Sequence, residues 1–239
     1  MTSRADLTLR WVRGPDVLDV GAAGHRPDPS STQWLHGRLR EAFPTVIGLD
    51  LSEKNVELLK AMGYPNLHAG DAQTFRINAM FDTIVAGEVI EHLENPAQFL
   101  ARAHEHLKPD GRLVLTTPYA FGLLNCVYAL LRFPRTCINP EHTMWFCPMT
   151  ISELSKRAGF SVAHWELILD LPDRPNPPVA LKRAVVWLYE RMSRVLPPRL
   201  RCNGMLFVLR VSEDHDGVEV AAQVASGGRR RMHHQARTR

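Results

Sequence analysis

Short apolar runs alternate with longer amphipathic stretches through the first two thirds of the chain. The runs 17–20, 46–50 and 81–86 consist mostly of Val, Ile, Leu and Ala, as expected of strands buried on both faces of a parallel sheet. Between them, apolar residues recur three or four positions apart in 34–43 and 52–62, which is the spacing of one helical face. This alternation predicts an α/β fold, with a parallel sheet covered by helices.

Polar residues predict where the helices begin. Ser31 or Thr32 is expected to cap the first helix and Ser52 the second. Asn95 precedes a proline at the start of a third, since proline is favoured in the first turn of a helix. Thr150 marks the start of a fourth.

A long insertion interrupts the alternation at 118–146. Its segment from Phe121 to Phe133 is strongly apolar and is predicted to be helical. An insertion after the fifth strand lies over the strand ends, where folds of this class bind ligands. It is therefore expected to form a lid or a wall of the acceptor site. Its apolar spacing equally fits a core helix or the contact of a homodimer, so these alternatives stay open.

The C-terminal third is predicted to complete the sheet and then leave it. Strands are expected from Phe160 to about Leu169 and from Met205 to Val211, with a helix from Val179 to about Val195 between them. Residues 1–211 are thus expected to form one domain. The acidic and then arginine-rich residues 212–239 are predicted to be a disordered tail.

Composition narrows the class of protein. The formal net charge is +4, but residues 228–239 hold five arginines, so a broad nucleic-acid-binding face is not expected. The four cysteines lack a C-x-x-C pair, which argues against a zinc site or a disulfide framework. No apolar stretch of about 18 residues and no signal peptide is found, so no membrane insertion is expected and the chain is predicted to be cytoplasmic.

The run from Val17 to Gly24 ends a strand in a turn of small residues. Such residues let main-chain N–H groups approach a ligand closely. Asp19 lies in this strand, Asp50 ends the second strand and Asp71 follows the third. Because the carboxyl ends of parallel strands meet at one edge of a sheet, these acids are expected to line one ligand crevice.

On these motifs the chain resembles the class I S-adenosylmethionine (SAM)-dependent methyltransferases over about residues 10–211. The resemblance implies a Rossmann-like, doubly wound, mostly parallel sheet of seven strands with an antiparallel last strand. It implies SAM as the cofactor, with Asp50 at the ribose and Asp71 at the adenine. Ala23 stands where many members carry glycine, a change small enough to keep cofactor binding. The cofactor-binding residues that the resemblance implies are Asp19, Gly21, Ala22, Gly24, Asp50, Leu51, Asp71, Ala72, Gly87 and Glu88.

The segment after the fourth strand carries two acids and a histidine. If a helical turn begins there, Glu88, Glu91 and His92 share one face, since residues three and four apart are neighbours on a helix. Such a set suits Mg²⁺ or Mn²⁺, with His142 as a fourth ligand. The Glu-x-x-Glu-His unit is similar to that of two metal-binding branches, the ubiquinone-pathway O-methyltransferases and the small-RNA terminal 2′-O-methyltransferases. In many other members the first acid contacts the cofactor and the histidine packs locally.

Three residues are candidates for the chemistry of methyl transfer. An aliphatic hydroxyl is a poor nucleophile at neutral pH, so a histidine must remove its proton or a metal must lower its pKa. His142 is expected to be the base or a metal ligand, but not both in one step. Glu141 is a candidate for holding a sugar hydroxyl, and Tyr119 for the wall of the acceptor site.

The predicted reaction is O-methylation of a hydroxyl, and several acceptor classes stay open. The segment from Asn139 to Phe146 and the general layout resemble the actinobacterial methylmannose-polysaccharide 1-O-methyltransferases, which implies a mannoside or oligosaccharide acceptor. The metal motif and the arginine tail leave the 2′-hydroxyl of an RNA terminus open as the acceptor, and the apolar segment 121–133 leaves a phenolic quinone precursor open. Outside the family, the alternative is a nicotinamide-dependent oxidoreductase, although the third glycine of G-x-G-x-x-G is absent.

Overall fold

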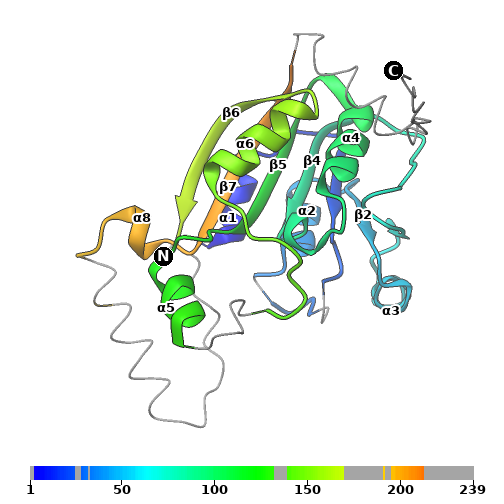
Figure 1. The fold of residues 1–239 in the computed structure, drawn as a ribbon. Helices are drawn as coiled ribbons and strands as arrows, with labels where there is room; N and C mark the ends of the chain where they lie inside the picture. The colour runs from blue at the N-terminus through cyan, green and yellow to red at the C-terminus, as the bar shows by residue number, and fades with distance from the viewer. Residues whose placement is uncertain are drawn as a thin grey trace, which may run out of the picture.

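The computed structural model describes residues 3–24, 28–31, 33–131, 139–169, 191 and 195–212, except for the side chains of Leu124 and Tyr128. Its strands form one seven-stranded sheet in the order β3-β2-β1-β4-β5-β7-β6 (Figure 1). Strands β1 to β5 are parallel, and β7 is antiparallel to both β5 and β6, which confirms the predicted doubly wound fold. The strands are β1 (Val17–Val20), β2 (Ile47–Asp50), β3 (Leu67–Ala69), β4 (Phe81–Gly87), β5 (Leu107–Pro118), β6 (Phe160–Ile168) and β7 (Gly204–Val211).

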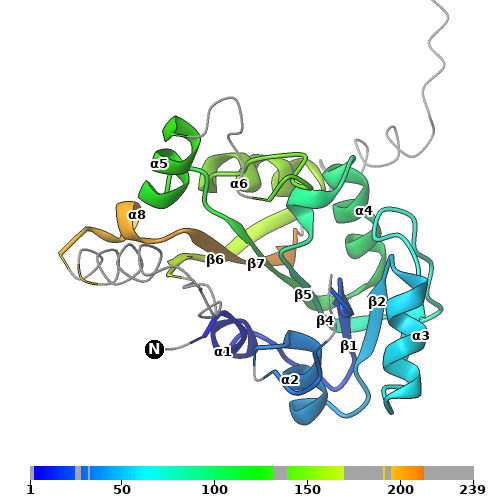
Figure 2. The ribbon, with the colours of Figure 1, turned by 90° about the horizontal axis from the view of Figure 1, so that it is seen from below.

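Helices cover both faces of the sheet (Figure 2). On one face, α4 and α6 pack against a core that includes Leu18 and Ile84. On the other face, the layer of α1 and α2 packs against Val17 and Val85. Neighbouring strand residues thus enter different layers, which explains why the strands have almost continuous apolar sequences. The helices are α1 (Arg4–Leu9), α2 (Leu35–Ala42), α3 (Glu53–Ala61), the 3-10 turn η1 (Ile90–His92), α4 (Pro96–His106), α5 (Leu123–Leu131), α6 (Pro148–Arg157) and α8 (Pro198–Arg201).

Two helices begin where the sequence predicts, and each has a side-chain cap. The hydroxyl of Ser52 accepts a hydrogen bond from the N–H of Asn55 at the start of α3. The side chain of Asn95 accepts one from the N–H of Gln98 at the start of α4. Both caps satisfy N–H groups that have no partner within the helix itself.

Two other helices begin differently from the prediction. Trp34 precedes α2 without a side-chain cap, and Ser31 instead closes a turn before the helix. α6 begins at Pro148, two residues before the predicted start at Thr150, because proline is favoured in the first helical turn. The Thr150 hydroxyl still takes part, since it accepts a hydrogen bond from the N–H of Cys147 at 3.0 Å.

The insertion leaves the sheet after β5 and returns to the same edge. α5 lies within the predicted apolar helix and packs against α8. An isolated parallel bridge between Tyr119 and Phe146 joins the two ends of the insertion. Both ends therefore lie at the carboxyl edge of β5, while the role of the insertion as a lid or dimer contact stays a prediction.

Some predictions concern residues outside the described ranges. They include Phe133, Cys137, most of the helix expected over 179–195 and the tail after Ser212. The other three cysteines are free thiols. Among the helices that the structure describes, none is long and apolar enough to cross a membrane.

Candidate active site

The turn after β1 is fixed by backbone hydrogen bonds to β2. Gly21 and Gly24 have φ values of 80° and 61°, which glycine adopts without strain. The N–H groups of Gly21 and Ala22 donate to the carbonyl of Leu49 at 2.8 and 3.1 Å. A Cβ at position 21 would lie 2.6 Å from Cγ2 of Val89. Both backbone conformation and space therefore require glycine there.

Asp50 connects the two sides of this turn. Its Oδ2 accepts hydrogen bonds from the N–H groups of Ala23 and Gly24 at 2.9 and 3.1 Å, and its Oδ1 accepts one from the N–H of Ser52 at 2.9 Å. A carboxylate offers about four acceptor positions, so Asp50 keeps capacity for a ligand hydroxyl. Its contact with the ribose of SAM stays a prediction.

Two aromatic side chains near the start of α2 support the turn from behind. Nε1 of Trp34 donates to the carbonyl of Ala22 at 2.8 Å. Nδ1 of His36 lies 3.0 Å from Oδ2 of Asp19, and these side chains are 2% and 3% exposed. Burial raises the pKa of Asp19, and the hydrogen bond with His36 opposes that rise. The carboxylate of Asp19 thus holds α2 behind the turn, and its predicted cofactor contact stays a prediction.

The other predicted cofactor residues lie at the carboxyl ends of neighbouring parallel strands. Asp71 follows β3, and its carboxylate accepts hydrogen bonds within the next turn. Ala72 is buried, whereas Leu51 at the end of β2 is 77% exposed. Ala23, at the position where the resemblance implies a glycine, is buried in a cluster that includes α3 residues. Its methyl group therefore packs away from the open side of the turn.

Glu88 does not share a helical face with the second acid of the motif. Its φ is 56°, the one positive φ among the described non-glycine residues, and η1 begins only at Ile90. Its Oε2 lies 3.2 Å from Nη1 of Arg4 in α1. The predicted helical turn beginning at Gly87 is wrong, because the left-handed backbone at Glu88 directs this side chain to α1.

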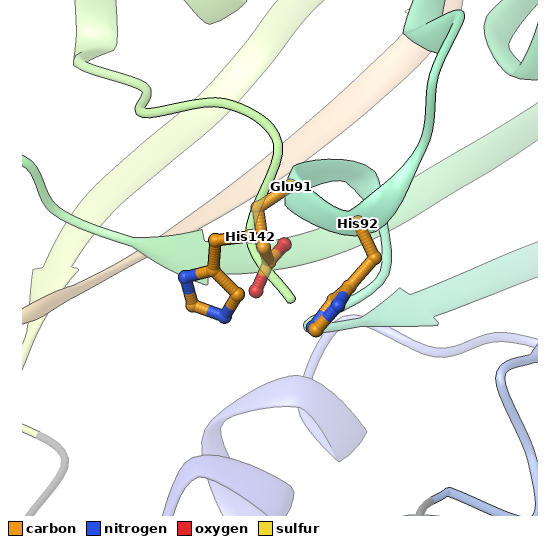
Figure 3. Close-up of side chains that lie close together, drawn as sticks. All are labelled: Glu91, His92 and His142. Carbon is orange, nitrogen blue, oxygen red and sulfur yellow. The ribbon is translucent and has the colours of Figure 1, made fainter. Parts of the chain in front are cut away.

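Three of the four predicted metal ligands come together (Figure 3). Glu91 and His92 project from η1, and His142 projects from the end of the insertion. One potential ligand atom of each residue lies within 4.8 Å of those of the other two. The ring centroids of His92 and His142 are 4.7 Å apart, with 89° between the ring planes. Glu88 is not part of this cluster.

Hydrogen bonds from β5 and the insertion place the cluster. Oγ1 of Thr117, at the end of β5, donates to Oε2 of Glu91 at 3.0 Å. The N–H of Thr143 donates to the carbonyl of Glu91 at 2.9 Å, and its hydroxyl donates to that of Leu93 at 2.8 Å. The backbone beside His142 is thereby tied to η1, although the two segments are far apart in sequence.

Glu91 is a buried carboxyl group with a raised pKa. The residue is 1% exposed. Burial raises its pKa to about 8, the negative charge of Glu88 acts in the same direction, and the hydrogen bond from Thr117 opposes them. Oε1 of Glu91 has no hydrogen-bond partner among the described residues. A cation beside Oε1 would favour the charged carboxylate and offset its burial.

The cluster fits a divalent cation. A carboxylate and two imidazoles form a mixed oxygen and nitrogen donor set, and Oε1 of Glu91 has no hydrogen-bond partner among the described residues. Imidazole nitrogens suit transition metals, whereas Mg²⁺ prefers oxygen ligands. Because Glu88 turns to Arg4, the remaining set favours Mn²⁺ over Mg²⁺.

Tyr119 and Glu141 lie in different surroundings near the cluster. Tyr119 is 9% exposed and belongs to the main core, and the ring of Phe121, 6.0 Å away, is largely exposed. Tyr119 is thus a core residue at the start of the insertion, and its place in the wall of the acceptor site stays a prediction. Glu141 lies in an exposed turn in which its N–H donates to Oδ1 of Asn139 at 3.1 Å. Its predicted contact with a sugar hydroxyl also stays a prediction.

The match to a known family decides the class of the protein. A family model described as a methyltransferase domain matches residues 4–164, more than half of the chain. The chain belongs to the SAM-dependent methyltransferases. This membership confirms the predicted enzyme class and makes the alternative of a nicotinamide-dependent oxidoreductase wrong.

Relatives of this methyltransferase are distant. The ubiquinone biosynthesis O-methyltransferase of Thiobacillus denitrificans is 27% identical over 185 residues, which cover 64% of this chain and 70% of the relative. A probable SAM-dependent methyltransferase of Mycolicibacterium smegmatis is 31% identical over 153 residues, which cover 62% of this chain and 53% of the relative. A solved SAM-dependent methyltransferase from Archaeoglobus fulgidus shares the fold, with a TM-score of 0.58, 19% identity and coverage of 86% of this chain and 90% of that one. A resemblance to methylmannose-polysaccharide enzymes finds no support in these three proteins.

Several residues of the candidate site were not predicted from the sequence. They are Arg4, His36, Thr117 and Thr143, each of which contacts a site acid or its backbone. Thr117 alone carries a local signal, as a polar residue at the end of an apolar strand. The other contacts join segments that only the fold brings together.

Proposed function

We propose that this methyltransferase transfers the methyl group of SAM to a hydroxyl oxygen held at the cluster of Glu91, His92 and His142. The observation that carries the proposal is the meeting of these three groups within 4.8 Å at the strand edge beside Glu88. SAM supplies an electrophilic methyl group on a sulfonium ion. Because the acceptor oxygen must approach that methyl group in line, residues that position it supply much of the rate.

The acceptor hydroxyl must also lose its proton. His142 faces the space shared with Glu91 and His92 (Figure 3), so it is placed to accept that proton. The hydrogen bonds of the neighbouring Thr143 to the η1 region hold the backbone beside His142 in position. General-base catalysis of this kind contributes about 10²- to 10⁴-fold to a rate.

Within this proposal, the cluster holds a divalent cation, Mn²⁺ or Mg²⁺. Oε1 of Glu91 and a ring nitrogen each of His92 and His142 would be its protein ligands. The cation supplies a Lewis acid that lowers the pKa of an acceptor hydroxyl. The buried Glu91 and its available Oε1 support this part of the proposal. His142 would then act as a ligand, and the proton of the acceptor hydroxyl would pass to solvent water.

Two acceptor classes follow from different observations. A phenolic hydroxyl is the first candidate, because relatives are named ubiquinone biosynthesis O-methyltransferases and because Tyr119 and Phe121 place two aromatic rings together at the start of the insertion. A saccharide hydroxyl is the second. The polar turn of Asn139 and Glu141, next to His142, favours a ligand with several hydroxyls.

Methyl transfer from labelled SAM to a panel of catechols, mannosides and RNAs with a free terminal 2′-hydroxyl tests the proposal. We expect an O-methyl product from a catechol or a mannoside, and a rate at least about 100-fold lower in His142→Ala. Glu94→Gln, which changes an exposed acid close to η1, is the matched control and should keep the rate. Transfer only to nitrogen or carbon, or an unchanged rate in His142→Ala, would contradict the proposal.

A further inference from the structure

Three arginines lie close together at the end of the sheet opposite the active site, where the parallel strands begin. Arg112 of β5 and Arg210 of β7 are direct partners across their antiparallel strands. Arg13 follows α1, and its N–H donates at 2.9 Å to the hydroxyl of Thr83, which is the partner of Arg112 on β4. Thr117 of the active site lies five residues farther along β5, about 16 Å away at the usual rise of a strand.

This arginine cluster, Arg13, Arg112 and Arg210, departs from the usual rules of sheet pairing. Like charges directly opposite each other destabilise a strand pair, and buried charges are almost always paired. Arg112 is nevertheless only 6% exposed, and its Nε has no hydrogen-bond partner among the described residues. Burial and the positive charges of its two neighbours lower its pKa. Local conflicts of this kind are expected where a protein binds something.

The described part of the chain offers no carboxylate to the arginine cluster. None of its three side chains forms an ion pair within the described residues. Asp16 and Asp82 lie at the same sheet edge, but both are held by Lys108, whose Nζ is 2.6 and 2.8 Å from their carboxylate oxygens. The cluster therefore keeps three positive charges without a described counter-charge.

We infer that the arginine cluster is an oxyanion-binding site, separate from the methyl-transfer site. A planar guanidinium presents its N–H groups as a fork that matches two oxygens of a phosphate or a carboxylate. Three positive charges favour a dianion or several carboxylates acting together. Two sources offer this chemistry. One is a free phosphate compound, and the other is the acidic stretch of this same chain that follows β7, namely Glu213, Asp214, Asp216 and Glu219.

Titration of the full chain with inorganic phosphate, at constant ionic strength, tests the site by calorimetry and by the midpoint of thermal unfolding. A second full-length protein carries the changes Glu213→Gln, Asp214→Asn, Asp216→Asn and Glu219→Gln. Each of these two proteins is also prepared with Arg13→Gln/Arg210→Gln. The control carries Arg76→Gln/Arg199→Gln instead, which removes the same charge from two exposed positions. Arg112 is left unchanged, because its removal from the sheet would also alter packing.

Two outcomes support the site and identify its source. Phosphate binding by the unchanged chain points to a free phosphate compound. Binding only by the chain with the neutralised acids, together with a lower unfolding midpoint of that chain, points to the acidic stretch as occupant. In either case Arg13→Gln/Arg210→Gln should weaken phosphate binding at least about tenfold, the effect of about 1.4 kcal/mol, and the control should not. If phosphate binds neither chain and the neutral changes leave the midpoint unaltered, or if binding survives in Arg13→Gln/Arg210→Gln, the inference is overturned.

Discussion

Oδ2 of Asp19 lies 3.0 Å from Nδ1 of His36, and the two side chains form an enclosed pair directly behind the glycine turn. The pair joins β1 to α2, which also supplies Trp34 as a donor to the turn at its start. The conformation of the turn therefore depends on a buried carboxyl group that the ligand itself need not touch.

Replacement of His36 by Phe should leave the carboxylate of Asp19 buried without its partner. We expect a loss of about 3–5 kcal/mol in the free energy of unfolding near pH 8, the usual effect of breaking a buried pair. Because burial raises the pKa of Asp19 above its ordinary 3.8, the stability linked to this group is greatest at acid pH and falls as the pH rises through the raised value. Urea unfolding at pH 4.5 and pH 8 should show the larger loss at pH 8. A loss of the same size at both values would remove Asp19 as the cause, and Asp19→Asn/His36→Phe, which carries no charge at the pair, should show little pH dependence.

Gly21→Ala should destabilise the turn more than Gly63→Ala does. Both glycines have positive φ, so each alanine costs about 1–2 kcal/mol in backbone strain. At position 63 the added Cβ meets nothing within 4 Å, whereas at position 21 it lies 2.6 Å from the side chain of Val89. The difference between the thermal unfolding midpoints of the two variants measures the effect of this contact with Val89. Val89→Ala added to Gly21→Ala should recover part of the difference, and no recovery would contradict the assigned clash.

Asp50→Asn should weaken SAM binding while the chain stays folded. An amide has one oxygen in place of the two that serve the N–H groups of Ala23, Gly24 and Ser52, so the turn and the predicted ribose contact both lose an acceptor. Loss of a hydrogen bond to a charged group costs about 1.5–3 kcal/mol, and the Kd for SAM should rise by about tenfold or more. Calorimetry measures the Kd, and far-UV circular dichroism checks the fold. Asp110→Asn is the control at an exposed position, and an unchanged Kd in Asp50→Asn would remove this residue from the cofactor site.

Chelation tests the metal part of the proposal. Treatment with excess EDTA should abolish turnover, and Mn²⁺ or Mg²⁺ should restore it except in Glu91→Gln. Because burial raises the pKa of Glu91 to about 8, a cation that binds at pH 7 must displace its proton, and affinity should increase from pH 6 to pH 8. Calorimetric titration with Mn²⁺ at three pH values measures the trend. Full turnover in excess chelator would assign His142 to proton transfer without a metal.

Most of the sheet could be predicted from local sequence because its strands and turns carry local signals. Buried parallel strands need continuous apolar runs, and the turn after β1 needs small residues at positive φ, as Gly21 shows. The helix starts at Ser52 and Asn95 are likewise local, since each side chain caps the backbone N–H three residues later. These features depend on neighbours in sequence, and the structure confirms them.

The active site was less predictable because distant segments determine it. The helical spacing of Glu88 and Glu91 suggested a shared face, but the left-handed backbone at Glu88 and its ion pair with Arg4 separate the two carboxylates. His142, in contrast, does join Glu91, because Thr143 bonds to the backbone of η1. Neither the pairing of Arg4 nor that of Thr143 has a periodicity that a single sequence could reveal.

The central claim is methyl transfer to an oxygen at the cluster of Glu91, His92 and His142. The most direct measurement is ¹³C NMR of the products formed from methyl-¹³C SAM and the acceptor panel, with the unchanged chain, His142→Ala and Glu94→Gln in parallel. The account predicts one new O-methyl resonance with the unchanged chain and Glu94→Gln, and its near absence with His142→Ala. A methyl resonance on nitrogen, sulfur or carbon, or equal O-methyl product from all three proteins, would contradict it.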